Sequence, residues 1–194
     1  MKKVAAIVGL LLLATMLNPV AASSSKGGGN YWHPYPYNLV PGDIVIGHNP
    51  TSDKIIPGYW THTGIIIGWS STYNEWIVVE ATMSHGVTWS TLSEFMSRYD
   101  TVAVLRVATS DYVRQNAVYF AYQQLGKPYD YGWWTKQVYG DSYYCSELVW
   151  AAYIAAGGPD IDQNPGWSWS FANGVAPDEV YYDGDTYVIY YHSA

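Results

Sequence analysis

The sequence predicts an α+β fold, in which a mostly antiparallel sheet, or a small barrel, has helices packed on one side. Three features of the 194 residues lead to this prediction. Segments rich in Val, Ile and Thr fill the first half, two helical segments follow, and strands return at the end. Such segregation of strands and helices is typical of α+β proteins. We find no internal repeat, and the length suits one domain with a sizeable core.

Five strands are expected before the first long helix, separated by turn residues. The strongest is THTGIIIGW at residues 61–69, which is rich in β-branched side chains and ends at a Ser-Ser pair. A short turn joins it to EWIVVEA at 75–81, so these two segments are expected to form a hairpin. The other three expected strands cover residues 43–47, 86–89 and 100–107. Thr91 and Glu94 have the spacing of a capping box, which predicts a short helix toward Arg98.

The second half of the chain begins with an expected helix at 110–125, which has a Ser-Asp pair at its start and a glycine after its end. A Pro-, Tyr- and Trp-rich loop leads to a second helix at 141–156, DSYYCSELVWAAYIAA, which stops at a Gly-Gly pair. A loop rich in Gly, Pro and Trp follows. Residues 180–182 and 186–191 are expected to close the domain as a hairpin turned by Asp-Gly.

The first 22 residues have the three parts of a secretory signal peptide. A basic Met-Lys-Lys start is followed by an apolar run at 4–17 and by Val-Ala-Ala, so we expect cleavage near Ala22 and a secreted or extracytoplasmic protein. The run is shorter than the roughly 20 residues of a spanning helix, and no second run follows, so we expect no stable membrane anchor. Residues 23–38 are expected to form a flexible leader and an aromatic arm, and residues 39–194 the folded domain.

Composition narrows the classes of partner. The formal net charge is −7, which argues against nucleic acid because binding of phosphates needs a basic patch. The 10 Trp and 20 Tyr residues are typical of aromatic-lined surfaces, and also of β-rich cores. We expect the protein to be a monomer.

Cys145 is the only cysteine of the chain, and it lies close to the start of the 141–156 helix, for which Asp141 or Ser142 is the expected N-cap. At a helix start the unpaired backbone N–H groups stabilise a thiolate and lower the pKa of a cysteine. A single cysteine in a secreted protein has no partner for an internal disulfide, so it is either buried or used. The helical spacing of Cys145 with Leu148, Val149 and Ala152 is equally typical of a small core residue.

A nucleophilic thiol needs a base and a group that orients this base. His62 lies within the strongest expected strand, beside Gly64, which leaves space for another chain element or a substrate. Glu80 ends an otherwise apolar face of the neighbouring strand, and a buried carboxylate is rare unless it is paired. The residues alone also allow a structural His62 and an exposed Glu80. The other histidines lie in expected loops or near the chain end: His33, His48, His85 and His192.

Six segments together resemble the circularly permuted branch of the NlpC/P60 papain-like superfamily, the YiiX-like group. In chain order they are THTGIIIG, WIVVEA, GVTWSTLSEF, GKPYDYGW, YYCSELVW and VAPDEV. The resemblance runs from about Pro41 to Pro177, and the segment around Cys145 is its most specific part. It implies a permuted papain-like fold and a catalytic domain at 39–194. The leader and the loop around Trp167 and Trp169 have no counterpart in it, and we expect them to determine substrate choice.

Residue by residue, the resemblance implies Cys145 as nucleophile, His62 as base and Glu80 as the group that orients the base. Tyr144 is a further candidate substrate-binding residue because of its place beside the thiol. The implied activity is hydrolysis of amide bonds, peptide or isopeptide-like, in cell-envelope material through a thioester acyl-enzyme. Two alternatives remain open: a lipid amide or ester hydrolase or acyltransferase on the same triad, and a non-catalytic envelope-binding module.

No metal and no cofactor are expected. No two histidines have the close spacing of a helical zinc motif. Residues 160–164 resemble the beginning of a calcium loop, but Pro165 follows, and Phe171 stands where the bidentate glutamate would be. A weaker surface calcium site is the alternative at this loop.

Overall fold

The computed structural model describes residues 30–51 and 58–194. The expected signal peptide at 1–22 and the first part of the leader, 23–29, lie outside the described residues. Within the described ranges, no helix combines the length and the apolar character needed to cross a membrane.

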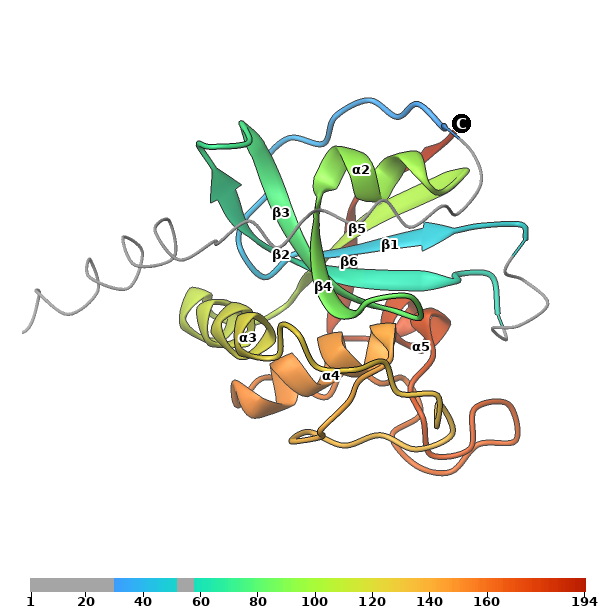
Figure 1. Cartoon of the computed structure of the whole chain (residues 1–194). Coiled ribbons are helices and arrows are strands. Elements are labelled where there is room, and N and C mark those ends of the chain that lie inside the picture. The colour runs from blue at the N-terminus through green and yellow to red at the C-terminus, as the bar shows by residue number, and fades with distance from the viewer. Residues whose placement is uncertain (1–29, 52–57) are drawn as a thin grey trace, which may run out of the picture.

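Six strands form one sheet in which every neighbouring pair is antiparallel, in the order β4-β3-β2-β1-β5-β6 (Figure 1). The strands are β1 Ile44–His48, β2 His62–Ser70, β3 Glu75–Thr82, β4 Gly86–Thr91, β5 Thr101–Val107 and β6 Thr186–Ser193. The five strands expected in the first half are all present, and the 61–69 and 75–81 segments form the expected hairpin. The structure confirms the α+β class.

Both faces of the sheet are covered, because its strands carry buried aliphatic side chains on each side. Ile65 of β2 belongs to the core beneath helices α3 (Asp111–Gln123) and α4 (Cys145–Ala155). Ile66, the next residue, belongs to the core beneath α2 (Leu92–Ser97). In Figure 1, α3 and α4 lie below the sheet and α2 lies above it. The two long helices therefore pack on one side as expected, while short α2 covers the other side with its apolar residues.

The expected C-terminal hairpin is wrong. Residues 180–182 lie in a short helix, α5 (Pro177–Tyr182), and not in a strand. The helix forms because proline suits a first turn and because the Glu179 carboxylate accepts a hydrogen bond, 2.9 Å long, from the backbone N–H of Ala176. β6 instead pairs with β5 along its whole length.

The described part of the arm is extended and crosses the end of α2. The Tyr31 N–H donates to the Ser97 carbonyl at 3.0 Å, and a ring nitrogen of His33 is 2.8 Å from the Tyr99 carbonyl. The arm therefore adds backbone contacts close to Tyr99, whose ring stacks on His62.

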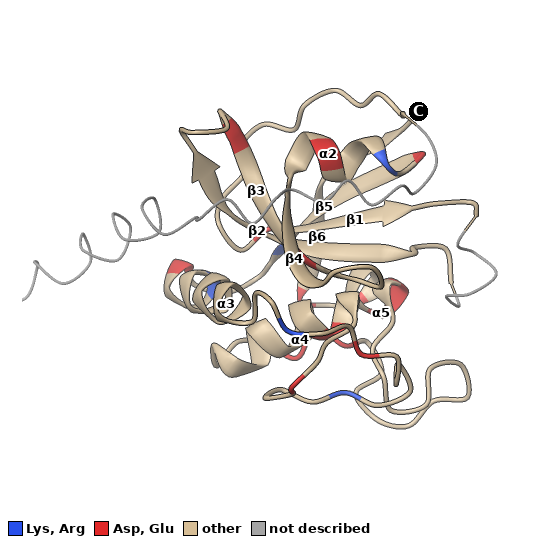
Figure 2. Cartoon of the chain, in the orientation of Figure 1, with Lys and Arg blue, Asp and Glu red and all other residues tan. Residues whose placement is uncertain are grey.

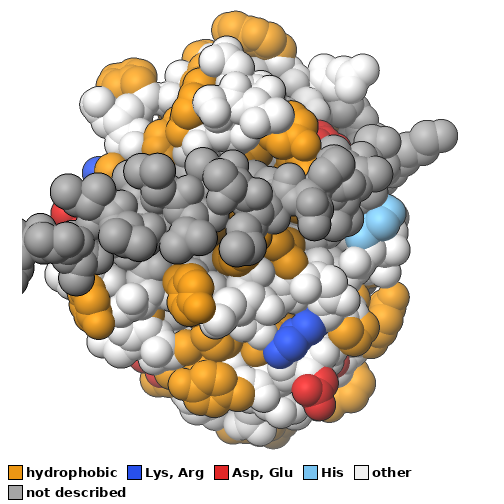
Figure 3. All heavy atoms as spheres, turned by 60° about the vertical axis from the view of Figure 1, so that its left-hand side comes forward, with side chains coloured by type: hydrophobic (Ala, Val, Ile, Leu, Met, Phe, Trp, Pro, Cys, Tyr) orange, Lys and Arg blue, Asp and Glu red, His pale blue; other side chains and the backbone are white. Residues whose placement is uncertain are grey.

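Charged side chains are sparse over the fold (Figure 2), and exposed hydrophobic side chains are spread over the face seen in Figure 3.

Candidate active site

Helix α4 places Cys145 at its first residue. Its N-cap is Tyr144, which has an extended backbone, and not Asp141 or Ser142 as expected. The Glu147 carboxylate takes the capping role, because it accepts the Tyr144 N–H at 3.2 Å and the Gln137 N–H at 2.8 Å. The buried thiol of Cys145 is thus next to the free N–H groups of a helix start, where a negative charge is stabilised.

His62 and Glu80 form a buried pair on the neighbouring strands β2 and β3. His62 Nε2 lies 2.7 Å from Glu80 Oε2, and the Glu80 side chain is 1% exposed. Gly64 makes this approach possible, because a Cβ at this position would lie 3.3 Å from the Glu80 Cβ and 2.5 Å from a methyl of Val78. The ring of His62 is further held by stacking on Phe95.

The second oxygen of Glu80 is also fully engaged. Oε1 accepts hydrogen bonds from Arg98 Nη2 at 2.6 Å and from Ser90 Oγ at 2.5 Å. Burial would raise the pKa of Glu80, but the charge of Arg98 and the contact with His62 hold it at about 2. Glu80 is therefore a carboxylate throughout the range around neutral pH.

The thiol and the imidazole change each other's ionisation. Burial would raise the pKa of Cys145, but the charge of His62, a hydrogen bond with its ring and one from Thr63 lower it below the ordinary value. Burial would lower the pKa of His62, but Cys145 and then Glu80 raise it to about 9. Because Nε2 faces Glu80, Nδ1 is the ring nitrogen left for the thiol. Around neutral pH the site can thus hold a thiolate beside an imidazolium.

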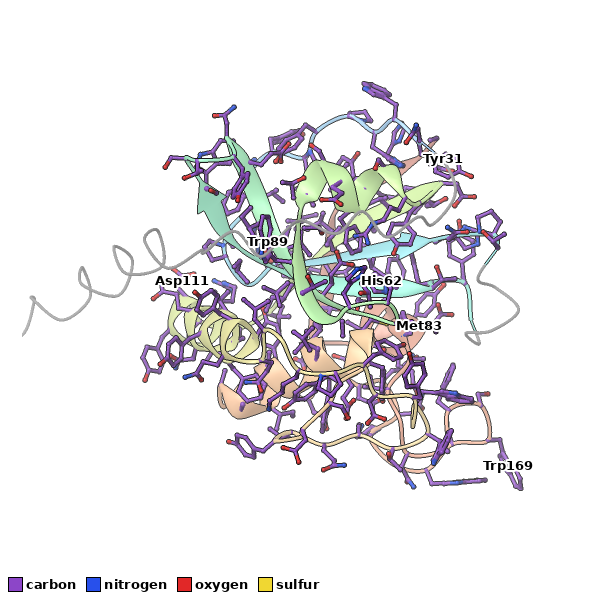
Figure 4. All side chains as sticks on the ribbon, viewed as in Figure 1. Tyr31, His62, Met83, Trp89, Asp111 and Trp169 are labelled. Carbon is purple, nitrogen blue, oxygen red and sulfur yellow. The ribbon has the colours of Figure 1, made fainter. Side chains whose placement is uncertain are left out.

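A pocket opens directly onto the thiol. Aromatic and aliphatic side chains make up almost all of its lining, which contains no Lys, Arg, Asp, Glu or His: Met83, Tyr129, Tyr131, Trp133, Tyr144, Cys145, Ser146, Phe171, Val175, Ala176 and Pro177. Figure 4 shows Met83 at the edge of the sheet that faces α4, and Trp169 far out on its loop. The pocket suits an apolar group next to the reacting bond.

Two tyrosines contribute to the pocket in different ways. The Tyr144 hydroxyl accepts the Val175 N–H at 2.9 Å, so it holds the pocket wall. Tyr129 is half-buried, and burial, followed by the charge of Cys145, raises its pKa. No protein partner for its hydroxyl occurs among the described residues, and this hydroxyl is therefore available to a substrate.

The sequence did not predict Arg98, Ser90 or Tyr129 as site residues. The sequence contains only indirect signals for these residues. A buried carboxylate at Glu80 needs a cationic partner, and Tyr129 lies in GKPYDYGW, one of the segments that resemble the family. The remaining histidines lie elsewhere, with His33 against His192 and His48 Nδ1 2.6 Å from Asp100.

The two Trp-rich loops lie beside the pocket. Trp133 and Phe171 bring one loop each into the lining, while the Trp169 side chain is 93% exposed. In the second loop, Asp162 pairs with Lys136, and Asp160 accepts the Trp150 indole N–H at 2.8 Å. Asp160 and Asp162, which belong to the loop considered for a surface calcium site, therefore already have protein partners.

Comparisons with known proteins are consistent with this geometry. A family model described as a permuted papain-like amidase enzyme, of the YaeF/YiiX, C92 family, matches residues 38–190. A similar solved structure is described as the metalloprotein yiiX from Escherichia coli O157:H7. It has a TM-score of 0.61 and 22% identity, and the alignment covers 79% of this chain and 98% of that one. No curated protein matches the chain.

Proposed function

Since the chain belongs to the C92 family of permuted papain-like amidases, we propose that it hydrolyses amide bonds through a triad of Cys145, His62 and Glu80. The observation that supports this assignment is the continuous contact from a helix-start thiol through one imidazole to a buried carboxylate. Acyl transfer by a thiol needs a base beside the nucleophile and a group that orients this base, and these contacts would supply both. The family membership itself makes the protein a papain-like amidase or peptidase-type hydrolase.

The reaction proceeds in two steps. The Cys145 thiolate attacks the carbonyl carbon, and the oxyanion is stabilised by N–H groups at the start of α4 and by the Tyr129 hydroxyl. His62 Nδ1 then gives its proton to the leaving amine as the C–N bond breaks, which leaves a thioester on Cys145. In the second step His62 takes a proton from water, whose oxygen attacks the thioester. The C–S bond then breaks and the acid leaves, which restores the Cys145 thiolate beside the His62 imidazolium.

We propose that the substrate is an amide of the cell envelope with an apolar acyl group. The expected signal peptide at 1–22 supports an extracytoplasmic location. Wall peptides carry carboxylates, and a site built for them would offer Lys or Arg, whereas the pocket beside Cys145 is aromatic and uncharged. This lining favours the lipid amide over the wall peptide as the substrate class.

The proposed mechanism assigns no step to a metal ion. The similar structure is described as a metalloprotein, but among residues 30–51 and 58–194 of this chain no three His, Cys, Asp or Glu side chains gather as a metal-binding group. His62 also has its Nε2 committed to Glu80. The residues at this site therefore do not fit a metal ion.

The test is hydrolysis measured by mass spectrometry on two sets of amides, a series with apolar acyl chains of increasing length and a set of wall-derived peptides. We expect turnover of the acyl series and its loss in Cys145→Ser, while the exposed loop variant His85→Ala keeps the wild-type rate. Full activity of Cys145→Ser would disprove the triad. Turnover of wall peptides alone would leave the triad in place and disprove the lipid-amide assignment.

A further inference from the structure

Arg98 joins the end of α2 to the carboxylate of Glu80. It directly follows the helix, as its C-cap, and its side chain is 9% exposed. Its Nη2 lies 2.6 Å from Glu80 Oε1, while the other oxygen of the same carboxylate faces His62 at 2.7 Å. The guanidinium is also held over the rings of Phe95 and Tyr99, at 5.0 and 5.6 Å from their centroids. Arg98 therefore has a fixed place behind Glu80, and it is not one of the residues that line the pocket.

We propose that Arg98 is a positioning residue that acts through Glu80, fixing this carboxylate toward His62 and balancing the charge of the buried site so that the thiolate–imidazolium pair is stable. The inference rests on the proposed function of Cys145, His62 and Glu80. It adds a fourth residue, which does not touch the substrate, to the three that carry the reaction.

The charge count gives the physical reason. The reactive state contains two negative groups, the Cys145 thiolate and the Glu80 carboxylate, and one positive group, the His62 imidazolium. Arg98 brings the sum to zero inside the protein. Without it the site would hold one net negative charge with little water to solvate it, and the least costly relief is a proton on the thiol. Arg98 is thus expected to favour the thiolate even though Glu80 and His62 lie between Arg98 and Cys145.

Other polar groups near the site do not replace this charge. Ser90 of β4 donates to the same oxygen of Glu80 but is neutral. Glu94 of α2 interacts with Arg98 from a half-buried position, where solvent screens its charge. Burial, as the largest effect, raises the pKa of each tyrosine that interacts with the thiol, so these side chains stay neutral: Tyr99, Tyr129 and Tyr144. Arg98 is therefore the only cation besides His62 that interacts with Glu80 among the described residues.

The test is the rate of Cys145 alkylation by iodoacetamide between pH 5 and 9 in the purified protein. Arg98→Gln removes the charge, Arg98→Lys keeps it, and Arg106→Gln breaks a matched ion pair with buried Asp43, 2.8 Å long, at another place in the fold. Thermal unfolding of each variant is measured alongside. We expect Arg98→Gln to be alkylated about tenfold more slowly at pH 6, with the inflection of the profile about one unit higher. Arg98→Lys and Arg106→Gln should keep the wild-type inflection.

A profile of Arg98→Gln that equals the wild-type one, whatever its melting temperature, would reduce Arg98 to a structural role. If Arg98→Gln does not fold, Arg98→Lys decides, because a one-unit displacement with the charge retained would overturn the inference. A wild-type thiol that titrates as an ordinary cysteine would contradict the proposed function, and it would overturn the Arg98 inference with it. A wild-type protein that reacts fast at pH 6 with no effect of Arg98→Gln would overturn the Arg98 inference alone.

Discussion

Glu80→Gln tests the orientation of the base, because the change keeps the shape of the side chain and removes its charge. The Glu80 carboxylate accepts hydrogen bonds on both oxygens, from His62 Nε2 on one side and from Arg98 and Ser90 on the other. A glutamine can offer only one acceptor oxygen. Because Arg98 is a donor only, the amide oxygen must face Arg98, and the amide NH₂ must face His62.

This arrangement would place the His62 proton on the wrong nitrogen. An NH₂ group next to Nε2 makes Nε2 the acceptor and moves the proton to Nδ1, the nitrogen that must receive the thiol proton. Such a tautomer error costs roughly 10⁴-fold in kcat in a serine protease. Loss of the carboxylate charge next to His62 adds a shift of about 1–3 pKa units against the imidazolium. We therefore expect kcat of Glu80→Gln to fall by at least about 10³-fold.

Stability should fall too, since Arg98 would keep its buried charge without a counter-ion, at a cost of about 3–5 kcal/mol. The assay is amide hydrolysis under saturating substrate together with thermal unfolding, and ¹⁵N NMR of the imidazole reports the tautomer. Glu94→Gln is the matched control, because it removes a half-buried carboxylate near Arg98 that has no contact with His62 among the described residues. The reasoning is refuted if folded Glu80→Gln stays within tenfold of the wild-type kcat.

Three further predictions concern the surroundings of the triad. Gly64→Ala should lose about 1–3 kcal/mol of unfolding free energy and most of the activity, because its Cβ would lie 2.5 Å from a methyl of Val78 and 3.3 Å from the Cβ of Glu80, whereas Gly166→Ala, in open space, should lose neither. Tyr129→Phe should lower kcat by roughly 10²-fold without a change in melting temperature, and an equal kcat would remove its hydroxyl from the oxyanion site. Burial raises the pKa of Glu147 to about 7, whereas a carboxyl group ordinarily ionises near 4.5. Glu147 therefore stabilises the fold most below pH 4.5 and loses that contribution as pH rises through 7. The difference in unfolding free energy between wild type and Glu147→Gln, measured with denaturant, should change between these two pH values and be constant outside them.

The local parts of the site could be predicted from the sequence. The β-branched strand that carries His62 and the apolar strand that ends at Glu80 form their hairpin through neighbouring residues, and the register pairs Gly64 with Glu80. Because that pairing is short-range, the alternation of each strand made His62 and Glu80 candidates for one site, although the residues alone also allowed an exposed Glu80. The helix that carries Cys145 was also expected, because polar residues stand at its start and a Gly-Gly pair follows its end.

The remaining parts depend on packing that a local pattern does not contain. The start of α4 was placed too early, because Glu147, engaged with the Gln137 N–H of the preceding loop, caps the helix at Tyr144 in place of an earlier polar residue. The contact of Arg98 with Glu80 arises because α2 packs on the face of the sheet opposite α3 and α4. The hairpin expected at the C-terminus failed because the tyrosines of α5 look like strand residues while the Pro177 start is helical.

The ionisation of Cys145 tests the central claim most directly, and the pH dependence of its alkylation by iodoacetamide measures it. With a lowered thiol pKa and a His62 pKa near 9, we expect wild-type protein to react fast at pH 6 and His62→Ala to react at least tenfold more slowly there. Because the chain has one cysteine, the signal is unambiguous. A wild-type thiol that stays unreactive until pH 8.5 or above, with no effect of His62→Ala, would contradict the thiolate–imidazolium pair and the mechanism built on it.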